Sequence, residues 1–256
     1  RFWWCPCGLS AFLPLHAAGL YREWDDLGSN IFDYVVSSYI PTTSMLHRAG
    51  QPQEVPPKPF HLLAVAEAEV RGWANLPGTK LELELINKHS SGHRVTELVR
   101  SNATADATKR EMESATWVHF ACHGIQDTME PTSSALILSN GSRLTYLDLI
   151  RMNLPHAQFA FLSACQTAMG TSYLSHEFAH LATGMLMAGY RGVIGTMWAI
   201  RDDDAPFIAD LVYKKLFEGG KPDHTQAASA LADAVCALRK ERRAPSESWV
   251  PFVHIG

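Results

Sequence analysis

Two short apolar runs constrain the fold of this chain more than any other feature. Residues Trp117–Gly124 read Trp-Val-His-Phe-Ala-Cys-His-Gly, and residues 158–165 read Gln-Phe-Ala-Phe-Leu-Ser-Ala-Cys. Runs of this length are typical of strands that are buried on both faces, as strands are in parallel sheets. Each run also carries a chemically active residue near its downstream end, His123 in the first and Cys165 in the second.

Strand and helix signals alternate along the chain from Phe60 onward. Further β-type segments are expected at Phe60–Ala66, His93–Val99 and Val193–Ile200, with helical segments between them. Alternation with short connections predicts a largely parallel sheet that is covered by helices on both faces. The helices are expected within residues 78–87, 104–114, 145–152, 175–190, 201–219 and 225–238.

Local signals add four expectations. Leu81, Leu85 and Ile86 should lie on the apolar face of the helix that begins at Gly78. The Asn-Gly pair at residues 140–141 should turn a hairpin, and Thr225 should cap the last helix. Trp249–Ile255 is β-like and is expected to form an edge strand.

Residues 1–59 are irregular by comparison, with four prolines at positions 52, 56, 57 and 59. The simplest organisation is one domain over residues 1–256, with an irregular N-terminal part (1–59) and an α/β core (60–256). Because the chain opens at Arg1, we expect it to be a piece of a longer protein.

Composition argues against several classes of function. The formal net charge of −4 gives no basic surface for nucleic acid. Residues 182–200 contain four glycines and Arg191, which favours a helix, a turn and a strand over a membrane span. The five cysteines, at 5, 7, 122, 165 and 236, fit neither a disulfide framework nor a zinc ribbon. We therefore expect a cytoplasmic protein with no cofactor, metal, membrane or nucleic-acid partner.

Cys165 and His123 form the strongest candidate site. Residues beyond the carboxyl ends of parallel strands gather at one edge of the sheet, where reactive groups are found. A thiolate is a nucleophile, and a neighbouring imidazole can activate it and protonate a leaving amine. Gly124 has no side chain, so its backbone N–H and that of Cys165 could bind an oxyanion. The alternative is that Cys165 is an inert buried thiol.

The other thiols and His119 are expected to be structural. Cys122 directly precedes His123, so strand alternation points it to the opposite face of the sheet. Cys236 lies among alanines within the last helix and is expected to be core. His119, inside the same strand as His123, is expected to be a packed imidazole.

Two polar clusters have competing interpretations. Residues 176–180 read His-Glu-Phe-Ala-His, which matches the zinc-protease motif, but the apolar stripe of the same helix must face the core. Asp202, with the two acids after it, lies beyond a strand end. These acids either cap the next helix or form a negative wall for a basic substrate.

The ordered motifs resemble those of the CHAT domain, a caspase-like family often found behind tetratricopeptide repeats. The resemblance rests on Trp117–Gly124, Ser134–Leu138, Leu162–Gly170 and Thr196–Asp204, with earlier pieces such as Leu76–Thr79. The residues of these motifs are most similar to those of fungal members of the family. It implies a caspase–hemoglobinase-like three-layer α/β/α sandwich around a mostly parallel sheet.

The resemblance further implies a regulated cysteine endopeptidase in an intracellular signalling protein, with a protein substrate and upstream repeats. The catalytic histidine of the family maps onto His123 and its nucleophile onto Cys165, with Gly124 serving the oxyanion. Ser163 would lie near the pocket for the residue that precedes the cut. Ser163 and Gln166 are neutral where relatives often carry acids, so no basic preference is implied. A catalytically silent scaffold module of the same fold is the alternative.

Overall fold

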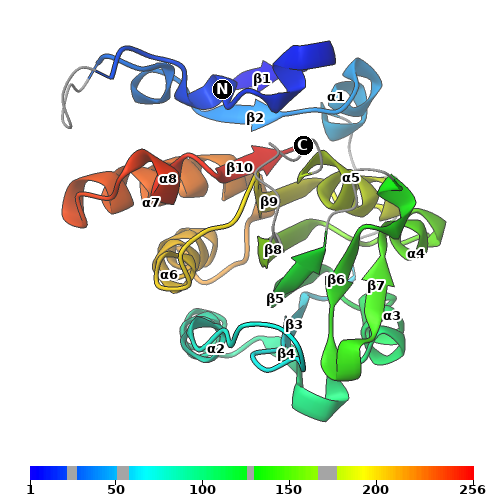
Figure 1. Cartoon of the computed structure of the whole chain (residues 1–256). Helices are drawn as coiled ribbons and strands as arrows, with labels where there is room; N and C mark the ends of the chain where they lie inside the picture. The colour runs from blue at the N-terminus through cyan, green and yellow to red at the C-terminus, as the bar shows by residue number, and fades with distance from the viewer. Residues whose placement is uncertain (22–27, 51–57, 126–129, 167–177) are drawn as a thin grey trace.

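The computed structural model describes residues 1–21, 28–50, 58–125, 130–166 and 178–256. Its strands form one sheet in the order β1-β2-β10-β9-β8-β5-β3-β4, and β6 and β7 extend it from β5 (Figure 1). The strands are β1 (Phe2–Trp4), β2 (Ser37–Tyr39), β3 (His61–Ala66), β4 (Arg94–Val99), β5 (Trp117–Ile125), β6 (Ala135–Ile137), β7 (Arg143–Thr145), β8 (Phe159–Gln166), β9 (Gly192–Thr196) and β10 (Phe252–Ile255).

Pairing within the sheet is mostly parallel, as the alternating sequence pattern predicts. Strands β4, β3, β5, β8 and β9 run parallel to one another, whereas β10 is antiparallel to β9 and β6 is antiparallel to β5. The helices are α1 (Thr43–Gly50), α2 (Gly78–His89), α3 (Ala105–Met112), α4 (Tyr146–Arg151), α5 (Phe178–Ala188), α6 (Asp204–Leu216), α7 (Ala227–Glu241) and α8 (Ser246–Trp249).

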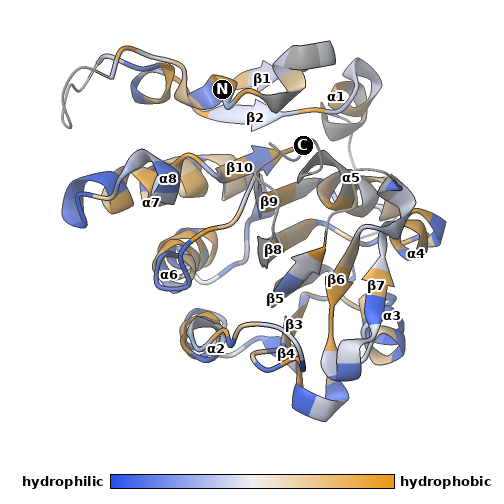
Figure 2. Ribbon diagram, in the orientation of Figure 1, coloured by the Kyte–Doolittle hydropathy of each residue, from blue (hydrophilic) through white to orange (hydrophobic). Residues whose placement is uncertain are grey.

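Helices cover both faces of the sheet, with α2, α6 and α7 on one side and α3, α4 and α5 on the other (Figure 1). Alternate residues of the central strands fill the two cores. Trp117 and Phe161 pack under α6 and α7, while Phe120 and Leu162 pack under α3, α4 and α5. In Figure 2, β6 and β9 carry the hydrophobic colour, whereas α7 carries both hydrophobic and hydrophilic residues. This division matches strands buried on both faces and amphipathic helices.

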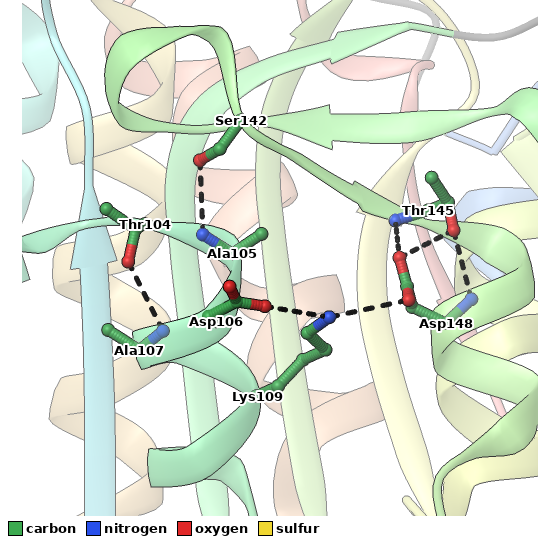
Figure 3. A network of polar contacts seen from close by, with 8 residues as sticks. All are labelled: Thr104, Ala105, Asp106, Ala107, Lys109, Ser142, Thr145 and Asp148. Carbon is green, nitrogen blue, oxygen red and sulfur yellow. Dashed lines mark hydrogen bonds and ion pairs between the residues drawn. The ribbon is translucent and has the colours of Figure 1, made fainter.

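The ends of α3 and α4 are fixed by side chains on neighbouring turns (Figure 3). Thr104 caps α3 by accepting the backbone N–H three residues on, at 3.3 Å. Thr145 and Asp148 form a reciprocal capping box at the start of α4. Lys109 on α3 lies 3.1 Å from Asp106 and 3.6 Å from Asp148, so it joins the two helices. Thr145 was predicted to begin α4, and the structure confirms it.

Three local predictions are wrong. β10 is not an edge strand, because β2 pairs with its free side and β1 pairs beyond β2. Leu81 is 49 % exposed, since the buried face of α2 consists of Thr79, Glu82, Leu83 and Ile86. Thr225 does not cap α7: it lies in a 3-10 turn, where its hydroxyl and N–H donate to Asp223, and α7 begins after that turn.

The hairpin predicted at the Asn-Gly pair is confirmed, because β6 and β7 pair antiparallel on either side of it. Asn140 and Gly141 have φ of 56° and 71°, which is the left-handed backbone that an Asn-Gly turn requires. Residues 1–59 contribute β1 and β2 to the main sheet, although their proline-rich end at 51–57 lies outside the described residues. Among the helices described, none combines the length and the apolar character needed to cross a bilayer.

Candidate active site

The register of β5 and β8 brings the two candidate catalytic residues together. In this parallel pairing His123 is the Cα partner of Cys165, and Gly124 is the partner of Gln166. The two positions therefore lie side by side near the carboxyl ends of adjacent strands, as the sequence predicts. The side chains of Cys165 and Gln166 lie outside the described part of the structure, so the geometry rests on their backbone and on the groups around His123.

The imidazole of His123 is held by the segment that connects β3 to α2. Its Nε2 lies 2.7 Å from the carbonyl oxygen of Ala74, and its ring packs on Trp73 with centroids 5.0 Å apart. Because a carbonyl only accepts, we assign the proton of the neutral ring to Nε2. Its Nδ1 is buried and has no hydrogen-bond partner among the described residues. This nitrogen is therefore available to accept a proton.

Burial sets the charge state of His123. The side chain is fully buried, and this desolvation lowers the pKa of the imidazole below its usual value. The Ala74 carbonyl and the negative charge of Asp202 both raise the pKa, but by less than burial lowers it. The ring is therefore neutral at pH 7, which is the form that a general base requires.

Ser163, two residues before Cys165, belongs to a buried polar network. Its hydroxyl donates to Glu82 Oε2 at 3.1 Å, and Glu82 Oε1 lies 2.9 Å from Nε2 of His119. The second contact is within ion-pair distance, but its geometry is not that of a hydrogen bond. The other ring nitrogen of His119 lies 3.2 Å from the Tyr213 hydroxyl. His119 is thus the packed imidazole that the sequence predicts.

Asp202 is one of the acids that the sequence offers either as a helix cap or as part of a substrate pocket, and in the structure it caps a helix. Its Oδ2 accepts the backbone N–H of Gly78, the first residue of α2, at 2.6 Å. Asp203 is exposed, and the buried Asp204 lies 3.6 Å from Arg242. Of the three acids, Asp202 is the one whose charge acts on His123.

Gly124 lies inside β5 with a strand on each side. Its Cα partners are Gln166 on β8 and Leu136 on β6. A backbone N–H within a sheet points toward one of its two neighbouring strands. An oxyanion role therefore requires that the Gly124 N–H is not used in this ladder, and the role stays a prediction.

The remaining sequence candidates divide clearly. Cys122 is buried in the core on the α3–α5 side, opposite the side of Trp117, as predicted. Cys236 was predicted to be core but is partly exposed, because it lies at the margin of the α7 stripe. Residues 176–177 and the side chain of His180 lie outside the described part, so the zinc-protease motif is untested. Within the described residues, no group of three His, Cys, Asp or Glu could hold a metal ion.

Sequence reasoning missed Ala74, Trp73 and Glu82. A backbone carbonyl leaves no sequence signal, and Trp73 lies in an irregular segment. Glu82 did leave one: Thr79, Glu82, Leu83 and Ile86 follow helical spacing, so a carboxylate shares the buried face. Of the predicted apolar face, Ile86 is buried, whereas Leu81 is exposed and Glu82 takes a buried position instead.

Comparisons with known proteins identify the family and the fold of the chain. The sequence model of the CHAT domain family matches residues 1–256. No curated protein sequence matches the chain. The solved structures that resemble it include the RgpB pro- and mature-domain complex of Porphyromonas gingivalis (TM-score 0.57, 10 % identity, 88 % of this chain and 56 % of that one). They also include the Saccharomyces cerevisiae separase–securin complex (TM-score 0.56, 12 % identity, 87 % of this chain and 14 % of that one).

A second RgpB structure, described as an Arg-specific cysteine proteinase, has a TM-score of 0.51 at 10 % identity and covers 86 % of this chain. The chain therefore spans 53–56 % of the RgpB chains and 14 % of the separase chain. At these identities the likeness shows the fold alone. The fold is the α/β arrangement of caspase-like cysteine peptidases, which the motif resemblance implied.

Proposed function

Because the chain belongs to the CHAT domain family, we propose that it is a regulated cysteine endopeptidase that acts on a protein substrate. The observation that carries the proposal is the pairing of Cys165 with His123, whose imidazole has one nitrogen bound to Ala74 and the other without a described partner. This is the arrangement that a base needs to take a proton from a thiol on the adjacent strand.

The proposed reaction uses His123 Nδ1 as the proton carrier. It takes the proton of the Cys165 thiol, and the thiolate attacks the carbonyl carbon of the scissile peptide. The imidazolium then gives that proton to the leaving amine as the carbon–nitrogen bond breaks, which leaves an acyl-enzyme. Water, deprotonated by the neutral ring, attacks the acyl carbon and releases Cys165. The Ala74 carbonyl accepts from Nε2 throughout, so the ring keeps its orientation and the imidazolium is stabilised.

The backbone N–H groups of Gly124 and Cys165 are the proposed oxyanion donors. Ser163, Gln166 and Asp202 remain the proposed pocket residues. The Ser163 hydroxyl is bound to Glu82 in this structure, so a substrate that used it would compete with that carboxylate. The preference for the substrate residue that precedes the cleaved bond therefore depends on whether the hydrogen bond between Ser163 and Glu82 breaks.

Regulation is the third part of the proposal. The His123 imidazole is fully closed to solvent, which favours a latent site that opens on activation. We propose upstream tetratricopeptide-type repeats as the partner that provides this signal, in a cytoplasmic signalling protein of the fungal type. The likeness to a separase that was solved in complex with securin fits regulation by a protein partner.

Cleavage by an activated protein tests the proposal. The longer protein that contains this chain, with its activating partner, should cut a protein substrate, and Cys165→Ala should abolish the cut. Cys122→Ala is the matched control, because that thiol lies in the opposite core and should leave cleavage intact. Undiminished cleavage by the Cys165→Ala protein would refute the assignment.

A catalytically silent scaffold module is the second candidate. The observations that favour it are the full burial of His123 and the closed Ser163–Glu82 contact, because both keep a substrate out. Such a module predicts that Cys165 reacts with an alkylating reagent no faster than Cys236, the partly exposed thiol on α7.

A further inference from the structure

Asp202 reaches across the molecule to the start of another helix. It lies between β9 and α6, and its Oδ2 accepts the N–H of Gly78 at 2.6 Å. That N–H is one of the donors that a helix N-terminus leaves without an internal partner, and a carboxylate is the acceptor that satisfies it best. Gly78 and Asp202 pack too closely for any larger residue at position 78, because a Cβ there would lie 2.6 Å from the backbone oxygen of Asp202.

The segment that Asp202 fixes is the one that orients His123. Residues 67–77 connect β3 to α2, and the Glu67 N–H donates to Ala121 on β5 at 3.0 Å. At its far end the segment leads into Gly78. Between these two anchors, Ala74 accepts from His123 Nε2 and Trp73 packs on the ring. Movement at the Gly78 end would therefore move the carbonyl that sets the tautomer of His123.

Asp202 also contributes its charge. It is the described residue whose negative charge raises the pKa of His123 against the effect of burial. The site has other charged or titratable groups on the elements packed around the ring, and none of them is a described cause of this shift. They are His119 on β5, Glu67 and Glu69 in the connecting segment, Glu82 on α2, Arg201 and Asp203 beside Asp202, and Cys165 on β8.

We propose that Asp202 is a positioning residue of the Cys165–His123 site: it fixes the N-terminus of α2, so that the Ala74 carbonyl stays on His123 Nε2. This inference rests on the proposed function for its catalytic meaning. It differs from simple helix capping, because loss of the Asp202 contact should change the environment of His123 as well as the start of α2.

Two variants separate the charge from the contact. Asp202→Asn keeps an oxygen acceptor for Gly78 but removes the charge, so His123 should titrate at lower pH than in the wild type. Asp202→Glu restores the charge and should return the titration toward the wild type. Asp203→Asn is the matched control, because that acid is exposed and makes no side-chain cap hydrogen bond. The titration is followed by NMR on the chain with labelled histidine.

A third variant tests the contact. Asp202→Ala removes the acceptor as well, so the Gly78 amide should exchange with solvent about tenfold faster or more, the effect of losing a hydrogen bond to a charged group. An unchanged Gly78 exchange rate in Asp202→Ala, or a His123 titration in Asp202→Ala identical to that of the wild type, would overturn the inference.

These outcomes are independent of the proposed function. The His123 titration needs no peptidase activity, so it decides the role of Asp202 even in a silent module. Conversely, a Cys165→Ala protein that still cleaves would refute the peptidase assignment while the titration result stood. In an active enzyme, the acid limb of kcat/KM should move to lower pH in Asp202→Asn, as the titration does.

Discussion

Glu82 shows how much of this site depends on single residues. Its carboxylate is 1 % exposed and contacts Ser163 on β8 and His119 on β5, the strands that carry Cys165 and His123. Removing one partner of a buried charged contact leaves the other groups without compensation. Glu82 therefore joins α2 to the two strands that carry the proposed catalytic residues.

Replacing Glu82 tests this role. Glu82→Ala should lower the free energy of unfolding by about 3–5 kcal/mol, because His119 and Ser163 lose their partner. Glu82→Gln keeps the shape and one acceptor and should cost about 1–3 kcal/mol. Glu84→Gln is the control, since Glu84 is exposed and 3.8 Å from Lys80, and it should change stability by less than about 0.5 kcal/mol. Urea unfolding measures all three, and equal effects at 82 and 84 would contradict the account.

Residue chemistry could be predicted where alternation within a strand decides it. His123, Cys122 and His119 follow from their positions in one apolar run, and the structure confirms the packing of Cys122 and His119. Ala74 could not be predicted, because its contribution is a backbone carbonyl from an irregular segment. Such a contact depends on tertiary geometry, and it cannot be predicted from the residue type because every residue has a backbone carbonyl.

Among the elements, the end of α5 matters because this helix packs against β9, the strand beside β8, which carries the proposed nucleophile. Gly189 ends the helix with φ of 134°, and a Cβ there would lie 2.3 Å from the Leu154 backbone oxygen. Neither the backbone angle nor the space allows a side chain. The end of α5 at Ala188 lies within the helical range 175–190 that the sequence predicts.

Gly189→Ala should therefore destabilise the protein by about 2–4 kcal/mol, the sum of backbone strain and overpacking. Gly92→Ala is a matched control, because its φ is also positive, at 86°, but the space around it is open. It should cost about 1–2 kcal/mol from strain alone. Thermal unfolding distinguishes the two variants, and an equal loss at both positions would show that Leu154 yields without cost.

Strands could be predicted from the sequence where their apolar run is long. The prediction of a strand's neighbours failed where those neighbours lie far away in the sequence. The strands β3, β5 and β8 follow from their composition. The position of β10 did not, because its neighbours β2 and β9 lie far apart in sequence and one of them belongs to the irregular N-terminal part. A three-residue strand such as β2 gives too weak a signal to forecast such a pairing.

Over the whole molecule, two buried histidines join the N-terminal strands to the C-terminal end. His16 lies 2.8 Å from the Tyr39 hydroxyl and 2.9 Å from the Val250 carbonyl oxygen. His254 lies 3.0 Å from the Ser38 hydroxyl and 3.2 Å from the Arg1 guanidinium. Burial lowers the pKa of His16 to about 4, and burial with the Arg1 charge lowers the pKa of His254 to about 3.

Stability should therefore depend on pH in a defined window. Both histidines are neutral in the folded protein but bind a proton near pH 6.5 in the unfolded protein. Their contribution to the free energy of unfolding is therefore fully present above about pH 6.5. It should fall as the pH drops from there toward 4, by about 3 kcal/mol for His16. Urea unfolding between these values measures the slope, and replacing His16 with Asn should reduce it. A flat profile would contradict the burial of these rings.

The arrangement of the whole molecule could be predicted from the sequence to the level of the sheet and its two helical layers. The pairing of His123 with Cys165 followed from the same pattern, because both strands are parallel and end at one edge. The contacts around these two residues could not be predicted. They come from the segment that connects β3 to α2, from α2 itself and from the loop before α6.

Alkylation of Cys165 as a function of pH tests the central claim most directly. In the protein with its activating partner, mass spectrometry should find Cys165 labelled faster than Cys236 at about pH 6, because the imidazolium that forms when His123 takes the thiol proton stabilises the thiolate. His123→Ala should slow the labelling of Cys165 and leave Cys236 unchanged. If Cys165 and Cys236 react at equal rates at every pH, or if His123→Ala has no effect on Cys165, the two residues do not form a catalytic pair.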